Sequence, residues 1–143
     1  MPPLTRWSIR TSFLYLLAAL LVGVLWALRS LISMPPVVNT LSPVYFHLFL
    51  VGWITQLIFG VVFWLFPKSE GDRPDEEPLG WLTYIFLNSG LVLRLIAEPN
   101  SAFAPGSVWG WLLVVSAVLQ WLAALTFVAG TWPRVYERKP TRR

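Results

Sequence analysis

Four long apolar runs most constrain what this chain can fold into. They cover about residues 12–33, 44–66, 79–97 and 108–131. An α-helix rises about 1.5 Å per residue, so each run is long enough to cross the roughly 30 Å hydrocarbon core of a bilayer. The sequence therefore predicts an all-α integral membrane protein, a four-transmembrane-helix antiparallel bundle that forms one domain over residues 1–143.

Little of the chain lies outside these runs. Of 143 residues, 56% are hydrophobic and 13% are charged, which is not a soluble composition. This leaves no room for a soluble catalytic domain, a nucleotide-binding βαβ unit or a transport fold of two multi-helix repeats. The absence of cysteine excludes disulfides, iron–sulfur ligation and covalent attachment of a c-type haem. Only nitrogen, oxygen and thioether ligands remain.

Positive charge gathers on one side of the predicted bundle. That side holds Arg6, Arg10, Lys68, Arg73, Arg134, Arg138, Lys139, Arg142 and Arg143. Because cytoplasmic flanks retain Lys and Arg, we expect an N-in/C-in protein, with both termini cytoplasmic, in an inner membrane of bacterial type. The basic tail 132–143 is expected to lie at the lipid surface rather than bind nucleic acid, and the acidic stretch 68–78 to form a solvated loop.

His47, the only histidine, lies near the outer start of the second run. A lone histidine at a helix end is either an interfacial hydrogen-bonding group or a metal ligand. On α-helical spacing it heads a stripe with Val51, Ile54 and Ile58, and Gly52 allows a neighbouring backbone or a flat ligand to approach. Such a stripe suits a haem face, although ordinary helix packing uses the same residue types.

Two arginines are predicted at the same depth as His47. Arg94 lies about one turn before the outer end of the third run, and Arg29 lies near the outer end of the first. Either they snorkel to headgroups or pair with Glu98, or their guanidiniums flank an anionic group such as the propionates of a haem held by His47. Met34, in the connection at that depth, is a candidate second iron ligand or a plain surface residue.

Polar side chains near the middle of the membrane have a simpler interpretation. An amide or hydroxyl in hydrocarbon needs a partner, and a neighbouring helix can supply one. We therefore expect interhelical hydrogen bonds from Gln56, Asn88, Ser89 and Gln120.

The second run carries the motif of a known family. Residues 43–53 (PVYFHLFLVGW) and 60–68 (GVVFWLFPK) resemble the second helix of the catalytic subunit of haem-copper oxidases and nitric oxide reductases. In that family the histidine of this helix is an axial ligand of the low-spin haem. Residues 80–94 are similar in rhythm to the next helix. The matching motif covers about 25 residues, and the order of predicted helices is similar over residues 12–97.

The resemblance implies a haem-b-binding membrane protein for electron transfer or for gas or redox sensing in a respiratory context. The family takes its other haem and copper ligands from histidines on later helices that are missing here, so catalysis by this chain alone is not expected. The sixth iron position would be open, filled by Met34, or supplied by another chain, such as a second copy. The alternative is a haem-free structural or assembly subunit of a larger respiratory complex that packs through Gly52, Gly60 and Gly90.

Overall fold

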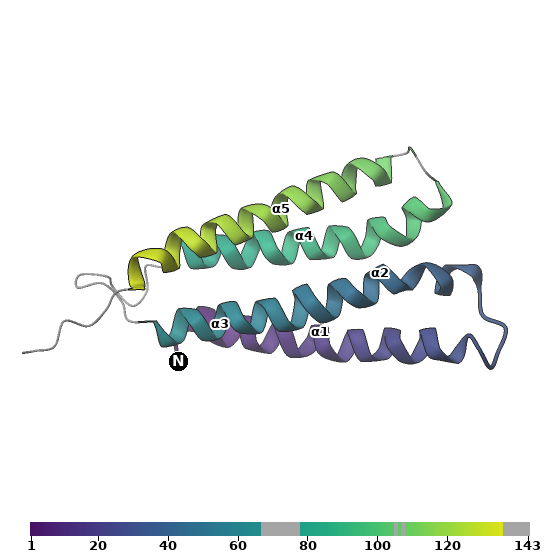
Figure 1. Ribbon diagram of the computed structural model, residues 1–143, viewed down its shortest axis with the longest axis horizontal. Helices are drawn as coiled ribbons and strands as arrows, with labels where there is room; N and C mark the ends of the chain where they lie inside the picture. Colours follow the sequence, from purple (N-terminus) through teal and green to yellow (C-terminus); the bar gives the residue numbers. More distant parts are fainter. Residues whose placement is uncertain (67–77, 105, 107, 136–143) are drawn as a thin grey trace, which may run out of the picture.

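The computed structural model describes residues 1–66, 78–104, 106 and 108–135. Its regular elements are all helical: α1 (Pro3–Leu28), η1 (Pro36–Thr40), α2 (Leu41–Phe46), η2 (His47–Thr55), α3 (Gln56–Leu65), α4 (Pro78–Phe103), α5 (Val108–Thr131) and η3 (Trp132–Arg134) (Figure 1). The elements from η1 to α3 follow one another without a break, and together they form a single long helix, here called the second helix.

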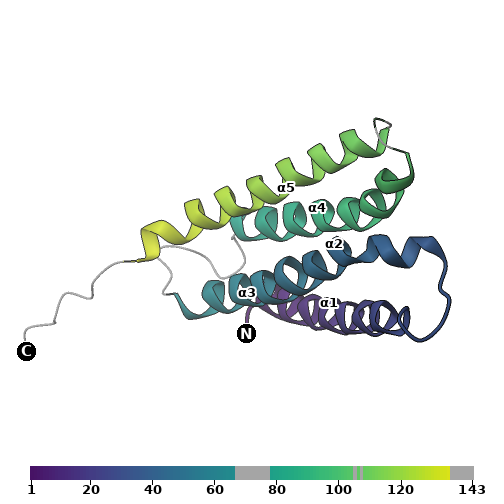
Figure 2. The same ribbon diagram turned by 45° about the vertical axis from the view of Figure 1, so that its right-hand side comes forward.

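The helices pair as two antiparallel hairpins that lie side by side (Figures 1 and 2). The first hairpin is α1 with the second helix, and the other is α4 with α5. Helix α4 packs against the first hairpin, whereas α5 packs mainly on α4. We call the end where Leu28 leads to Pro36, and Phe103 to Val108, the distal end; the described start of α1 and end of α5 lie at the opposite, terminal end.

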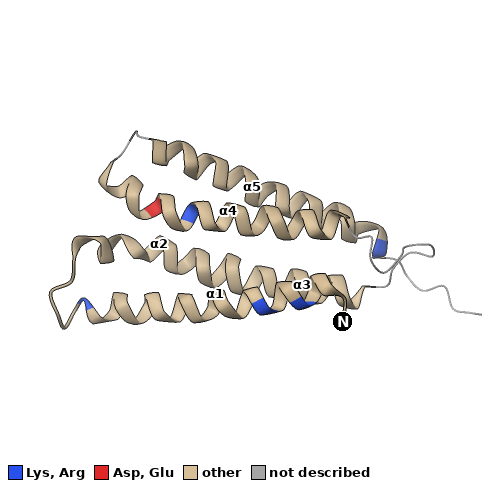
Figure 3. Cartoon of the chain, turned by 180° about the vertical axis from the view of Figure 1, so that it is seen from behind, with Lys and Arg blue, Asp and Glu red and all other residues tan. Residues whose placement is uncertain are grey.

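Four helices are long and apolar enough to cross a membrane, which confirms the predicted all-α fold with four spans by length and composition. Side chains support a lipid environment, because Leu14, Leu17 and Leu21 of α1 are 65%, 64% and 61% exposed. Polar residues occupy the interior instead, with Thr5, Ser8, Ser12, Gln56, Thr83 and Ser116 all buried. Charged residues occur at only a few places along the described chain (Figure 3).

Three of the four long helices have bounds that differ from the predicted ones, and the second helix begins at Pro36 rather than at residue 44. Helix α1 covers Pro3–Leu28 rather than 12–33, because proline is favoured in the first helical turn and the chain turns at Arg29. Helix α4 continues to Phe103 through Pro99, past the predicted end at residue 97, and Asn100 Nδ2 donates to the carbonyl of Ile96 at 2.7 Å there. The predicted range 108–131 is confirmed. The predicted acidic loop and basic tail lie almost wholly outside the described residues.

A nine-residue π-helix, η2, interrupts the second helix from His47 to Thr55. Its i→i+5 hydrogen bonds make each turn wider than the 3.6 residues of an α-helix. Buried residues accordingly recur every four positions, at Val44, Leu48, Gly52, Gln56 and Gly60. The π-helix thus keeps one face of the second helix directed into the bundle along its whole length.

Glycines bring α1 close to the second helix. A Cβ atom on Gly23, Gly52 or Gly60 would lie 3.1, 2.8 or 2.8 Å from the side chain of Tyr45, Tyr15 or Ser8, respectively. These contacts run in opposite directions along the two helices, as an antiparallel hairpin requires. Small residues at such positions let helix backbones approach, and this packing supplies stability in lipid, where water does not drive helices together.

Polar side chains inside the bundle form hydrogen bonds between the helices. Tyr15 Oη donates to Asn88 Oδ1 at 2.9 Å, and Thr11 Oγ1 lies 2.9 Å from Tyr84 Oη, so α1 and α4 are joined twice. Ser116 Oγ of α5 donates to the carbonyl of Gly90 at 2.6 Å and accepts from Gln120 Nε2 at 3.2 Å. Gln56 Nε2 donates to the carbonyl of Ser8 at 3.3 Å. The expected interhelical role is thus confirmed for Gln56 and Asn88.

Candidate functional site

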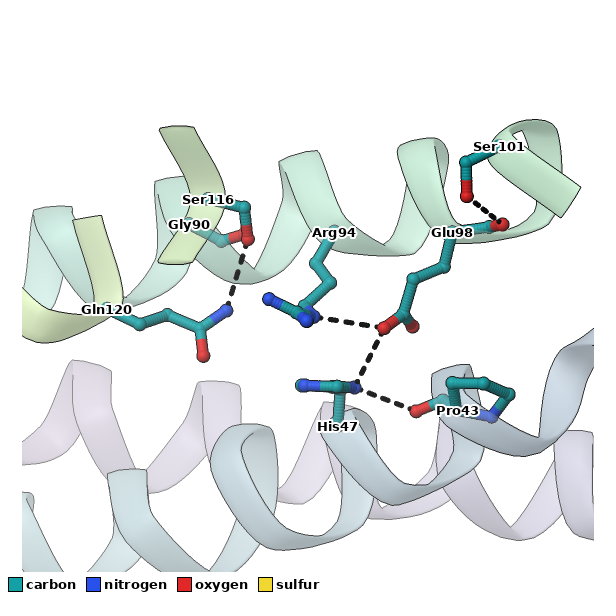
Figure 4. Close-up of polar contacts among 8 residues, drawn as sticks. All are labelled: Pro43, His47, Gly90, Arg94, Glu98, Ser101, Ser116 and Gln120. Atoms are coloured by element: carbon teal, nitrogen blue, oxygen red, sulfur yellow. Dashed lines mark hydrogen bonds and ion pairs between the residues drawn. The ribbon is translucent and has the colours of Figure 1, made fainter. Parts of the chain in front are cut away.

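One cluster of ionisable side chains lies inside the described helices, near the distal end. His47 stands where α2 passes into η2, and Arg94 and Glu98 lie one turn apart on α4 (Figure 4). His47 Nδ1 is 3.3 Å from Glu98 Oε1, and Arg94 Nε donates to the same oxygen at 3.0 Å. The cluster therefore links the two hairpins through a single carboxylate oxygen.

The surroundings of His47 determine which ring nitrogen carries its proton. Nδ1 lies 2.8 Å from the carbonyl oxygen of Pro43, one turn earlier, as well as 3.3 Å from Glu98 Oε1. Both oxygens are acceptors, so Nδ1 must carry the hydrogen. In the neutral ring the lone pair then belongs to Nε2, which points away from Pro43 and Glu98 in Figure 4 and has no partner within the described part of the chain. Such a nitrogen can bind a metal or accept a proton.

Glu98 is the only acidic residue in the four long helices that the structure describes, since the other Asp and Glu residues of the sequence lie at positions 70–77 and at Glu137. Its side chain is 9% exposed. Oε1 serves both His47 and Arg94, whereas Oε2 is buried without a hydrogen-bond partner among the described residues. A buried carboxylate is costly in an apolar environment, so its retention here depends on Arg94 and His47.

Arg94 uses only one of its donors in this cluster. Nε is taken by Glu98, and the remaining guanidinium N–H groups have no partner within the residues that the structure describes. The side chain is 23% exposed. The predicted pairing with Glu98 is confirmed, and the outer edge of the guanidinium can still bind a second anionic group.

The structure does not bring Arg29 into this cluster. Its guanidinium carbon lies 4.5 Å from the centre of the Trp26 ring on the same helix, and the residue is exposed. Met34 is partly buried in the connection between Leu28 and Pro36. Both residues are near the distal end, as predicted, but no hydrogen bond or ion pair joins either of them to His47 within the described chain.

The predicted stripe beside His47 is partly wrong, because it assumed α-helical spacing. With buried positions recurring every four residues, Val51 stays in the row of His47. Ile54 and Ile58 fall instead in the row of Leu50, where Leu50 and Ile58 are 50% and 51% exposed. The π-helix turns these two side chains away from His47.

The glycines are already used inside the bundle. A Cβ on Gly52 would lie 2.8 Å from Tyr15 and 2.9 Å from Leu91, so this glycine admits neighbouring side chains rather than a flat ligand. A Cβ on Gly60 would lie 2.8 Å from Cβ of Ser8, and a Cβ on Gly90 would lie 3.0 Å from the carbonyl oxygen of Ser116 on α5. The contact surface predicted for a packing subunit is therefore occupied by this chain's own helices.

No group of three or more His, Asp or Glu that could hold a metal ion occurs among the described residues. Comparison with protein-family models, with curated proteins and with solved structures found no match to this chain.

Sequence reasoning missed the central position of Glu98. It predicted that Glu98 pairs with Arg94, but it did not connect Glu98 to His47, 51 positions away in the chain. The available signal was that Glu98 directly follows the third run, away from the acidic residues at 70–77 and at 137, and that the predicted depth of the third run's outer end matches that of His47.

Proposed function

We propose that this protein binds haem b through Nε2 of His47 and serves electron transfer, or gas or redox sensing, in a respiratory membrane. The observation that carries the proposal is the state of the His47 ring. Its Nδ1–H is shared by Pro43 and Glu98, and its Nε2 lone pair has no partner in the described chain. Histidines that ligate metals almost always donate their other N–H to a carboxylate or a backbone carbonyl, and His47 does both.

The residues around His47 fit one face of such a cofactor. Val51 lies in the same row of the second helix, and the unused N–H groups of Arg94 suit a propionate. Bound haem would supply reversible one-electron chemistry. Gly52, Ile54, Ile58 and Arg29 are left out of this site, for the reasons given above.

A second iron ligand would come, in this proposal, from Met34, from a second copy of the chain or from another subunit, or that position would stay open. The motif-bearing second helix resembles that of haem-copper oxidases, but the later histidines of that family are missing from the sequence. We therefore assign no oxygen-reducing or nitric-oxide-reducing activity to this chain alone.

The orientation in the membrane is part of the same proposal. The nine Lys and Arg residues that the sequence assigns to the side of both termini favour a cytoplasmic location for the termini in an inner membrane of bacterial type. His47, Arg94 and Glu98 would then lie near the outer surface, within reach of an external electron donor.

A reduced-minus-oxidised visible spectrum of the detergent-purified protein, expressed with ample haem supply, tests the proposal. Sharp α and Soret bands are expected in the wild type. Met34→Leu should keep these bands if another chain, rather than Met34, supplies the second iron ligand. His47→Ala should lose both bands while it keeps its helical circular dichroism and elution volume. A flat spectrum in folded wild-type protein, or full haem retention in His47→Ala, would refute haem binding at this residue and favour the packing subunit.

The oligomeric state of the haem-loaded protein shows whether a second copy of the chain supplies the second iron ligand. If two His47 side chains share one haem, dilution should release the cofactor as the dimer dissociates. Full haem occupancy in a proven monomer would exclude the shared site.

A further inference from the structure

We propose that Glu98 sets the redox potential of the site because its carboxylate accepts the Nδ1–H of His47. This role rests on the proposed function. Glu98 would not touch the cofactor. It is a positioning residue that acts through the His47 ring, since its Oε1 lies 3.3 Å from Nδ1 and Nε2 is on the opposite side of the imidazole.

The electrostatic argument starts from the burial of the carboxylate. Its side chain is 9% exposed, and Oε2 has no hydrogen-bond partner in the described chain. Few other donors therefore weaken the interaction of the carboxylate with His47. In a poorly polarisable environment a charged acceptor acts more strongly than it does in water. A carboxylate on Nδ1–H makes the imidazole a stronger electron donor at Nε2. Stronger donation stabilises ferric iron more than ferrous iron, because the ferric ion carries the larger charge, and the potential falls.

Two further contacts make this effect specific to Glu98. The carbonyl of Pro43 also accepts from Nδ1, at 2.8 Å, and it holds the ring in place whatever stands at position 98. Arg94 donates to the same Oε1 at 3.0 Å and partly neutralises it. Removing the charge of Glu98 should therefore change the potential without releasing the histidine, and removing the charge of Arg94 should move the potential the other way.

The first test is a potentiometric titration of haem-loaded full-length protein. Glu98→Gln should raise the midpoint potential by a shift that corresponds to about a tenfold change in the equilibrium constant for reduction, 59 mV for a one-electron couple. Arg94→Gln should lower it. Glu137→Gln, which removes a carboxylate of the same kind outside the four predicted spans, is the matched control and should leave it unchanged.

The outcomes distinguish this inference from the proposed function. If the wild type binds haem but Glu98→Gln has the potential of Glu137→Gln, the role of Glu98 is overturned and haem binding stands. If Glu98→Gln loses its haem while the helices remain folded, Glu98 is needed for binding and its proposed role in tuning is wrong. A wild-type protein without haem overturns both.

The second test needs no haem. Because the chain contains one histidine, ¹⁵N-histidine labelling gives the ring signals of His47 alone. We expect the proton on Nδ1 in the haem-free wild type, with its ¹H resonance shifted upfield in Glu98→Gln as the charged acceptor is lost. A proton on Nε2 in the neutral wild-type ring, or the same Nδ1–H resonance in both proteins, would contradict the inference at its geometric basis.

Discussion

The close approach of helices at Gly52 allows a quantitative test of the packing. A Cβ atom at this position would lie 2.8 Å from Cβ and Cγ of Tyr15 and 2.9 Å from Leu91, and so would be wedged between α1 and α4. The Leu91 methyl can rotate away, but the Tyr15 atoms are fixed close to the α1 backbone. Overpacking costs about 1–3 kcal/mol, and replacing glycine by alanine in a helix returns about 1 kcal/mol. We expect Gly52→Ala to destabilise the fold by up to about 2 kcal/mol.

Gly110 of α5 is the matched control, because a Cβ there would meet nothing within 4 Å. Gly110→Ala should leave the free energy of unfolding unchanged or raise it by up to about 1 kcal/mol. Reversible unfolding in mixed micelles, followed by circular dichroism, measures both variants under one condition. If Gly52→Ala is as stable as Gly110→Ala, α1 and α4 do not enclose Gly52 as described, and the register of the bundle is wrong.

Two further substitutions test hydrogen bonds between helices. Tyr15→Phe removes the hydroxyl that donates to Asn88 and should lower the free energy of unfolding by about 0.6–1.7 kcal/mol in the same micelle assay. Tyr45→Phe is the control, because the Tyr45 hydroxyl makes no hydrogen bond within the described residues, and it should leave this free energy unchanged. Equal effects of the two substitutions would refute the α1–α4 hydrogen bond. Ser116→Ala removes the hydrogen bond from α5 to the carbonyl of Gly90 on α4 and leaves Gln120 Nε2 without its acceptor. We therefore expect the free energy of unfolding to fall by about 1 kcal/mol. A variant as stable as the wild type would contradict this hydrogen bond.

The sequence predicted the four helices because their cause is local. Length and apolarity alone decide whether a run can cross a bilayer, and the range 108–131 agrees with α5 at both ends. Depth was also predictable, since it follows from position along a helix, so His47 and Arg94 were placed at the same level before any contact was known. The partners of Gln56 and Asn88 were foreseen only as a class, that of groups on a neighbouring helix.

The remaining features depend on contacts between distant segments. The π-helix has no local signal in the sequence, since the widening of its turns keeps Leu48 and Gly52 in the interior that α1 and α4 create. Without it, α-helical spacing assigned Ile58 to the wrong face. Pro99 indicated the end of a helix that in fact continues, which hid the position of Glu98 inside α4. The contact of Glu98 with His47 required knowing which helices are neighbours.

The π-helix at His47–Thr55 also lets this helix tolerate the loss of one residue. An i→i+5 turn accommodates one residue more than an α-helical turn over nearly the same height, so it stores chain that a deletion could remove. Deleting one residue between Val51 and Thr55 would let the segment tighten towards an α-helix, with His47 still beside Glu98. The residues from Gln56 onward would then keep their places against α1, because the deleted residue is taken out of the wider turns. The π-helix can therefore absorb the loss of one residue without moving either the distal cluster or the contacts of α3 with α1.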